Sequence, residues 1–141
     1  MKAGARRLPG VLTALLAVSV AGMADVGEFV ATRPGMFTTA PGRAAGSVFG
    51  FALWTALAGT TAARLRGVKG ARSRWATLAL AGVTGLGSVG LTFIHLKAGI
   101  GGLRTVAGGV LGVAAFLLAL ASVSAGEQET PSKTVPGPAP S

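Results

Sequence analysis

The stretch RLRGVKGARSRW, from Arg64 to Trp75, carries five basic residues and no acidic residue. It separates two long segments, residues 44–63 and 75–94, that contain no charged residue. Basic residues in a short connection between apolar spans are typical of the cytoplasmic side of a membrane protein. We therefore interpret this stretch as a cytoplasmic connection between two transmembrane helices. Its basic side chains are expected to fix the topology and to attract anionic lipid headgroups: Arg64, Arg66, Lys69, Arg72 and Arg74.

Four such uncharged segments follow one another along the chain: Leu8–Ala24, Ala44–Ala63, Trp75–Ile94 and Thr105–Gly126. A bilayer core of ~30 Å needs about 20 helical residues, a length that the last three segments reach and the first does not. A single strand would leave its backbone groups unpaired in lipid, whereas a helix pairs them internally. The sequence therefore predicts an all-α polytopic membrane bundle of four transmembrane helices.

Composition supports this class and excludes others. Only 12% of the 141 residues are charged, against about 25% in a soluble domain. The formal net charge of +9 could indicate nucleic acid, but the basic residues lie in breaks between apolar segments rather than on one folded face. We expect the lipid bilayer, and not nucleic acid, as partner. The absence of cysteine excludes disulfides and thiolate sites.

The first segment has two interpretations. Lys2, Arg6 and Arg7 precede it, and small residues lie near its end, as in a secretory signal peptide. Residues 1–24 are then either a cleaved leader, which leaves three transmembrane helices, or a short first transmembrane helix. Both alternatives place the N-terminus in the cytoplasm during insertion.

One orientation satisfies the positive-inside rule throughout. Residues 25–43 carry balanced charges and form an extracytoplasmic loop, and the weakly basic connection 95–104 lies on the same side. Residues 44–125 form the three-helix membrane domain. The tail, residues 126–141, is rich in proline and small polar residues and is predicted to be disordered in the cytoplasm. We expect a multi-pass protein of the plasma membrane with both termini cytoplasmic.

The chain contains a weak internal repeat. RLRGVKGA (Arg64–Ala71) aligns with HLKAGIGG (His95–Gly102), which begins 31 residues later; so short a match also arises between Gly-rich segments through composition alone. With PGRAAG (Pro41–Gly46) and ADVGEF (Ala24–Phe29), the pattern resembles small uncharacterised integral membrane proteins of actinobacteria. That resemblance implies three or four membrane helices and brings no activity.

Small residues recur every fourth position, which places them on one face of each helix, where they allow close helix packing. These candidate packing residues are Gly46 and Gly50, then Thr77, Ala81 and Gly85, and finally Gly108 and Gly112. The pattern does not distinguish packing within the chain from packing between chains.

No catalytic function is expected. The four uncharged segments hold no ionisable residue, which a membrane pump normally needs, and no hydrolase, metalloprotease or phosphate-loop motif is present. We expect no catalytic, cofactor or metal site. The sequence favours a non-catalytic membrane protein acting by helix packing, as an accessory or scaffold subunit in a larger membrane complex or as a homo-oligomer. The alternative is a small transporter or channel component for an apolar or uncharged solute, suggested by Gly82, Gly85, Gly87 and Gly90.

Overall fold

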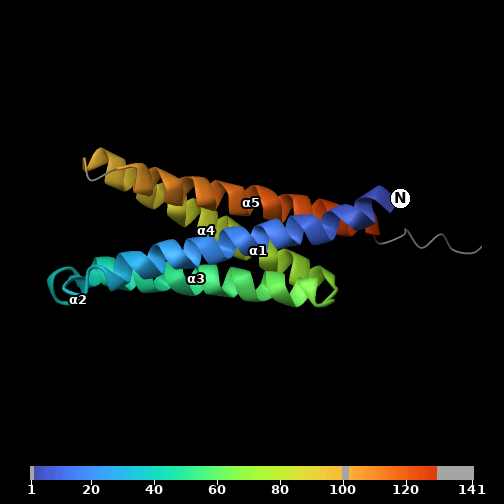
Figure 1. Ribbon diagram of the computed structural model, residues 1–141, viewed down its shortest axis with the longest axis horizontal. Coiled ribbons are helices and arrows are strands. Elements are labelled where there is room, and N and C mark those ends of the chain that lie inside the picture. The colour runs from blue at the N-terminus through green and yellow to red at the C-terminus, as the bar shows by residue number, and fades with distance from the viewer. Residues whose placement is uncertain (1, 100–101, 130–141) are drawn as a thin grey trace, which may run out of the picture.

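The structure is a computed structural model that describes residues 2–99 and 102–129, with side chains from 7 to 99 and from 102 to 127. In these ranges the chain is all-α, with no strand, which confirms the predicted fold class. Figure 1 shows the elements: α1 (Lys2–Ala31), α2 (Met36–Thr39), α3 (Pro41–Leu65), α4 (Ala71–Lys97) and α5 (Leu103–Glu129).

The four long helices form a ring in which each packs against two neighbours. α1 contacts α3 and α5, and α4 contacts α5 and, less extensively, α3. Because short connections join consecutive long helices, neighbouring helices run antiparallel (Figure 1). The α1–α3 and α4–α5 pairs diverge towards the end of the molecule that carries α2 (Figure 1).

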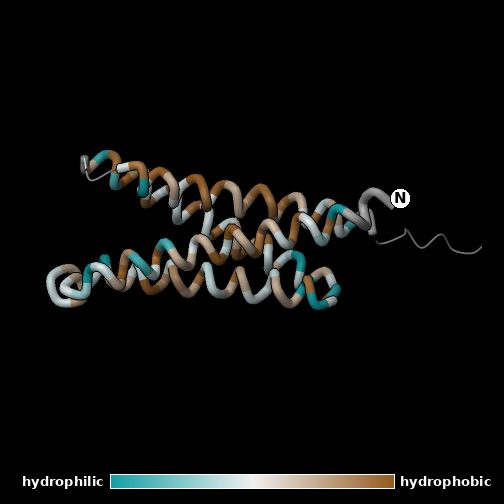
Figure 2. The backbone as a smooth tube through the Cα atoms, viewed as in Figure 1, coloured by the Kyte–Doolittle hydropathy of each residue, from teal (hydrophilic) through white to brown (hydrophobic). Residues whose placement is uncertain are grey.

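Each long helix is long and apolar enough to cross a membrane. Many of their large apolar side chains face outward, among them Phe49, Leu86 and Phe93. Figure 2 shows hydrophobic residues along the length of the helices and hydrophilic ones mainly near their ends. Such a surface would be unfavourable in water and suits contact with lipid. The fold fits a multi-pass membrane protein.

The core is narrow and rich in small side chains. Its buried cluster comprises Leu15 of α1, Trp54 and Leu57 of α3, Ala81 of α4, and Ala115 and Ala119 of α5. A methyl group on Gly22 of α1 would overlap the Trp54 indole ring, so the ring lies against bare backbone. Trp54 lies in the middle of α3 and packs inside the bundle, with 4% of its surface exposed.

The helices extend beyond the uncharged segments of the sequence. α1 continues to Ala31 and so includes Asp25 and Glu28, which were predicted to lie in an extracytoplasmic loop. Residues 25–31 contain no proline, and the chain leaves the helix only just before Pro34. α5 likewise continues to Glu129, so the first four residues of the predicted tail are helical; the rest lies outside the described residues, as does part of the second repeat copy. α4 is continuous through all four of its clustered glycines.

The α3–α4 connection, residues 66–70, depends on two glycines. Gly67 has φ +104° and Gly70 has φ +141°, backbone conformations that cost little only without a Cβ. Gly70 is the N-cap of α4 and therefore offers that helix no side-chain capping bond. The first backbone N–H groups of α4 therefore lie next to a basic connection, and no side-chain oxygen caps them.

Candidate functional site

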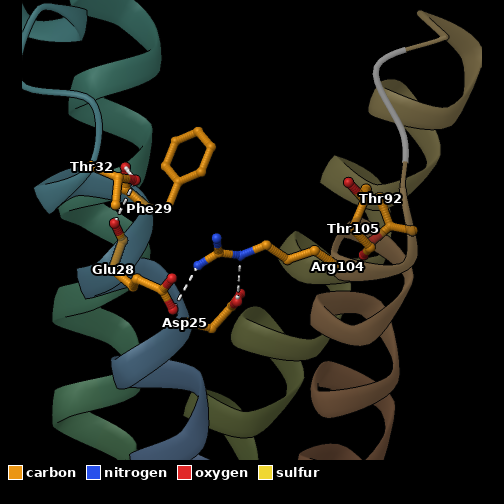
Figure 3. A network of polar contacts seen from close by, with 7 residues as sticks. All are labelled: Asp25, Glu28, Phe29, Thr32, Thr92, Arg104 and Thr105. Atoms are coloured by element: carbon orange, nitrogen blue, oxygen red, sulfur yellow. Dashed lines mark hydrogen bonds and ion pairs between the residues drawn. The ribbon is translucent and has the colours of Figure 1, made fainter.

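Polar side chains gather at opposite ends of the bundle in two clusters. The first, here called the Arg104 cluster, consists of Asp25 and Glu28 on α1 and Arg104 on α5 (Figure 3). Arg104 Nε lies 3.4 Å from Asp25 Oδ1, and Arg104 Nη2 lies 3.0 Å from Glu28 Oε2. All three side chains are partly exposed. The cluster ties the start of α5 to the end of α1.

The local sequence explains this arrangement. Asp25 and Glu28 are three residues apart and therefore lie on one face of α1. Arg104 is the second residue of α5, close to the positive end of the helix dipole, where two carboxylates compensate the unfavourable position. Beside it, Thr92 Oγ1 of α4 donates a hydrogen bond of 2.9 Å to the Thr105 carbonyl of α5 (Figure 3).

The second group, here called the Arg64 cluster, consists of Arg64 on α3, Arg74 on α4 and Ser122 on α5. Arg64 is only 8% exposed. Its Nη1 donates to Ser122 Oγ at 3.0 Å and its Nη2 donates to the Ser122 carbonyl at 3.4 Å. Ser122 Oγ in turn donates to the Ala119 carbonyl at 2.7 Å. This cluster ties the end of α3 to α5.

The inward direction of Arg64 was not predicted. The sequence interpretation grouped it with the basic connection, but α3 continues to Leu65 and Arg64 belongs to its last turn. Apart from Ala44 near its start, the buried positions of α3 are Trp54, Leu57, Thr61 and Arg64, spaced by three and four residues as on one helix face. That spacing was the available signal. Among the other basic residues, Arg66, Lys69 and Arg72 are exposed and Arg74 is half-buried; their role in topology stays a prediction.

Of the candidate packing residues, four lie at buried positions within the chain. Thr77 and Ala81 are fully buried on α4. Gly85 meets Gly112 of α5 so closely that a Cβ on Gly85 would lie 2.8 Å from the Gly112 carbonyl oxygen. A Cβ on Gly112 would lie 2.7 Å from Ser88 Cβ. The α4 and α5 backbones therefore touch at this crossing.

The remaining candidates have open surroundings. Gly108 is half-buried, and a Cβ there would meet only Asp25 Oδ2, at 3.7 Å. A Cβ on Gly46 or on Gly50 would have no heavy atom within 4 Å. On the other side of the same half of α3 lies an apolar surface groove of about 510 Å³, lined by Phe37 of α2 and by Pro41, Ala44, Ala45, Val48, Phe49 and Ala52.

Within residues 2–99 and 102–129, no three His, Asp or Glu side chains gather closely enough to hold a metal ion. Comparisons with protein families, with curated proteins and with solved structures found no match for this chain.

Proposed function

We propose that this is a non-catalytic protein of the plasma membrane that acts by packing its helices against other membrane helices, as an accessory or scaffold subunit or as a homo-oligomer. Its docking surface is the half of α3 nearest α2, here called the α3 face, which is open on two sides: Gly46 and Gly50 lie on one side of the helix, and the groove residues Ala45, Val48, Phe49 and Ala52 lie on the other.

The observation that carries this proposal is the open surrounding of Gly46 and Gly50. Small residues four apart let a second helix approach closely, and the chain uses that principle itself where Gly85 meets Gly112. On the α3 face the same spacing occurs on one side of the helix, and on the other side lies an apolar groove that, among the described residues, is lined only by α3 and by Phe37 of α2. Another membrane helix fits this surface by shape and by polarity.

We also propose an orientation of the chain in the membrane. The α3–α4 connection, which is the most basic one in the sequence, lies in the cytoplasm, together with both termini. The connection that contains α2 lies outside. The α3 face is then in the outer half of the membrane, and a partner helix must present its own small residues at that depth.

Cysteine crosslinking in native membranes tests the docking surface directly, because the chain has no cysteine of its own. Ala52→Cys places a thiol in the groove, and Ala79→Cys places one on the exposed side of α4 as a matched control. We expect crosslinked products from Ala52→Cys and little from Ala79→Cys. Products of twice the chain mass indicate a homo-oligomer, and products of another mass indicate a different subunit. Equal yields from both positions would refute the α3 face.

The second candidate function is a small transporter or channel component for an apolar or uncharged solute. It is supported by an apolar groove of about 200 Å³ between α4 and α5, lined by Gly82, Leu86, Val89, Val113 and Phe116. Gly82→Leu would fill this groove. Under this alternative the substitution abolishes solute flux into reconstituted vesicles, whereas under the packing proposal the vesicles show no flux with either chain.

A further inference from the structure

The two helix pairs of the ring, α1–α3 and α4–α5, are held together differently along their length. The buried apolar cluster in the middle of the bundle joins them through Leu15 of α1, Trp54 of α3 and Ala115 of α5. Near the α3–α4 connection, Arg64 of α3 donates hydrogen bonds to Ser122 of α5. Close packing therefore joins the pairs from the middle of the bundle to this end.

The end that carries α2 lacks such packing between the pairs. Where the structure describes side chains, no residue is buried on α1 after Gly22, on α4 after Gly85 or on α5 before Gly109. Gly109 itself lies against Thr92 of α4, which is a contact within one pair. The pairs diverge towards this end (Figure 1), and a Cβ on Gly50 of α3 would meet no heavy atom within 4 Å. Little apolar contact therefore holds the pairs together here.

The Arg104 cluster spans this divergence. Figure 3 shows the Arg104 side chain extending from α5 towards Asp25 and Glu28 on α1. Its guanidinium group makes one ion pair with each carboxylate, at 3.4 Å and 3.0 Å. Asp25 Oδ2 would lie 3.7 Å from a Cβ on Gly108, so this carboxylate also approaches the α5 backbone. A cationic side chain of one helix pair is thus held by two anionic side chains of the other.

We propose that the Arg104 cluster is an ionic latch that sets how far the two helix pairs separate at the end that carries α2. Each exposed ion pair shifts an equilibrium by only up to about fivefold, and salt screens it. Two such pairs, with little apolar packing beside them, are sufficient to favour the closed one of two similar arrangements. Because the opposite end is packed, releasing Arg104 lets the pairs move apart with that end as the hinge. The latch depends neither on the orientation in the membrane nor on the α3 face.

Distances between two spin labels measure this separation on the full chain in lipid nanodiscs. The chain has no cysteine, so labels can be attached at Ala31→Cys at the end of α1 and Ala98→Cys at the end of α4, both exposed. Exposed positions Leu65→Cys on α3 and Ser124→Cys on α5 give a matched pair at the opposite end. In Arg104→Gln we expect the fraction of molecules with a long Ala31–Ala98 distance to rise about two- to tenfold. The Leu65–Ser124 distance should not change.

Further conditions distinguish a latch from a general loosening of the bundle. Arg104→Lys keeps the positive charge and should resemble the natural chain more than Arg104→Gln does. Arg43→Gln removes an exposed charge from the same end and should have no effect. A salt concentration of about 1 M should reproduce the effect of Arg104→Gln without any substitution in the cluster. An Ala31–Ala98 distance that neither Arg104→Gln nor salt changes would overturn the inference, as would an equal change in Arg43→Gln or at the opposite end.

Discussion

Buried hydroxyl groups in this bundle are mostly satisfied by their own helix. Ser19 donates to the Leu15 carbonyl, Thr61 to Leu57 and Thr77 to Ser73. Such bonds remove the cost of placing a hydroxyl where no water is available. Thr84 on α4 is different, because its Oγ1 is buried and has no hydrogen-bond partner among the described residues.

Replacing Thr84 by valine should therefore stabilise the protein. The substitution keeps the shape and removes a buried polar atom without a partner, so we expect a gain of about 1 kcal/mol in the free energy of unfolding. Thr77→Val on the same helix breaks a 2.9 Å hydrogen bond and should cost about 0.5–1 kcal/mol. Unfolding in mixed detergent, followed by circular dichroism, measures both. A loss of stability in Thr84→Val equal to that in Thr77→Val would show that the Thr84 hydroxyl has a partner.

The Arg104 cluster should contribute little, and its contribution should depend on salt. Its ion pairs are about one-third to two-thirds exposed, and exposed pairs are worth about 0–1 kcal/mol. We expect Arg104→Gln to lower stability by that amount in dilute buffer and by less in about 1 M salt, where screening is nearly complete. Arg43→Gln, which removes a charge at the same end, is the control. A large loss that persists in high salt would contradict this account.

The positions of several charged residues could not be derived from hydropathy and charge alone. Asp25 and Glu28 are charged, and an uncharged stretch was the criterion for a span, so both were placed in a loop. The continuous helix to Ala31 follows from the lack of a helix breaker before Pro34, which hydropathy does not report. Arg64 was assigned to the cytoplasmic connection because it is charged. Its spacing from Trp54, Leu57 and Thr61 instead places it on the buried side of α3. For ionisable residues at helix ends, periodicity and breakers predict more than charge does.

At the scale of helices, the closest packing is between α4 and α5. Gly85 and Gly112 meet at the crossing, and Gly109 lies against Thr92, where a Cβ would come within 2.8 Å of Thr92 Oγ1. Small residues on both helices allow this approach, and backbone proximity increases the dispersion contacts that hold membrane helices together.

Gly112→Ala should disrupt this pair. The new methyl group would lie 2.7 Å from Ser88 Cβ and 3.2 Å from Gly85 Cα, so the helices must separate. We expect a loss of about 1–3 kcal/mol, typical of overpacking. Gly87→Ala, on a face with no heavy atom within 4 Å of the new methyl group, should be neutral. The free energies of unfolding of the two variants decide the matter, and equal values would mean that α4 and α5 are not this close.

The spacing of small residues predicted packing faces, but it could not say which faces meet inside the chain. Gly85 and Gly112 face each other because the short α4–α5 connection makes these helices an antiparallel pair. Gly46 and Gly50 have the same spacing and continue the stripe of Trp54 and Leu57 on α3, but a Cβ on either would meet no heavy atom within 4 Å, because the two helix pairs diverge at this end (Figure 1). The difference depends on how the helices cross in the assembled ring, and a single segment of sequence does not determine it.

At the scale of the whole molecule, the orientation can be tested with single cysteines. Val68 lies in the α3–α4 connection and Thr38 in α2, and both are exposed. A membrane-impermeant maleimide applied to intact cells should label Thr38→Cys and leave Val68→Cys unlabelled until the membrane is permeabilised. The opposite pattern would invert the topology that we propose.

The number and order of the four long helices were predictable because segment length and the lack of charge depend only on composition along the chain. The ring arrangement and the pairing of α1 with α5 depend on contacts between distant segments. Leu15 and Ser19 of α1 are fully buried in this ring. Whether the first segment is a leader or a helix could not be derived from its own residues, since both need the same apolar stretch.

The central claim is that the α3 face holds another membrane helix. The most direct measurement is the mass of the intact complex after gentle extraction from native membranes, for the natural chain and for two double variants. We expect the natural chain to carry a second protein or further copies of itself. Gly46→Leu with Gly50→Leu should release it as a single chain, and Gly87→Leu with Gly90→Leu, on an open face of α4, should not. A natural chain that is found alone, or a complex that survives the α3 substitutions, would contradict the account.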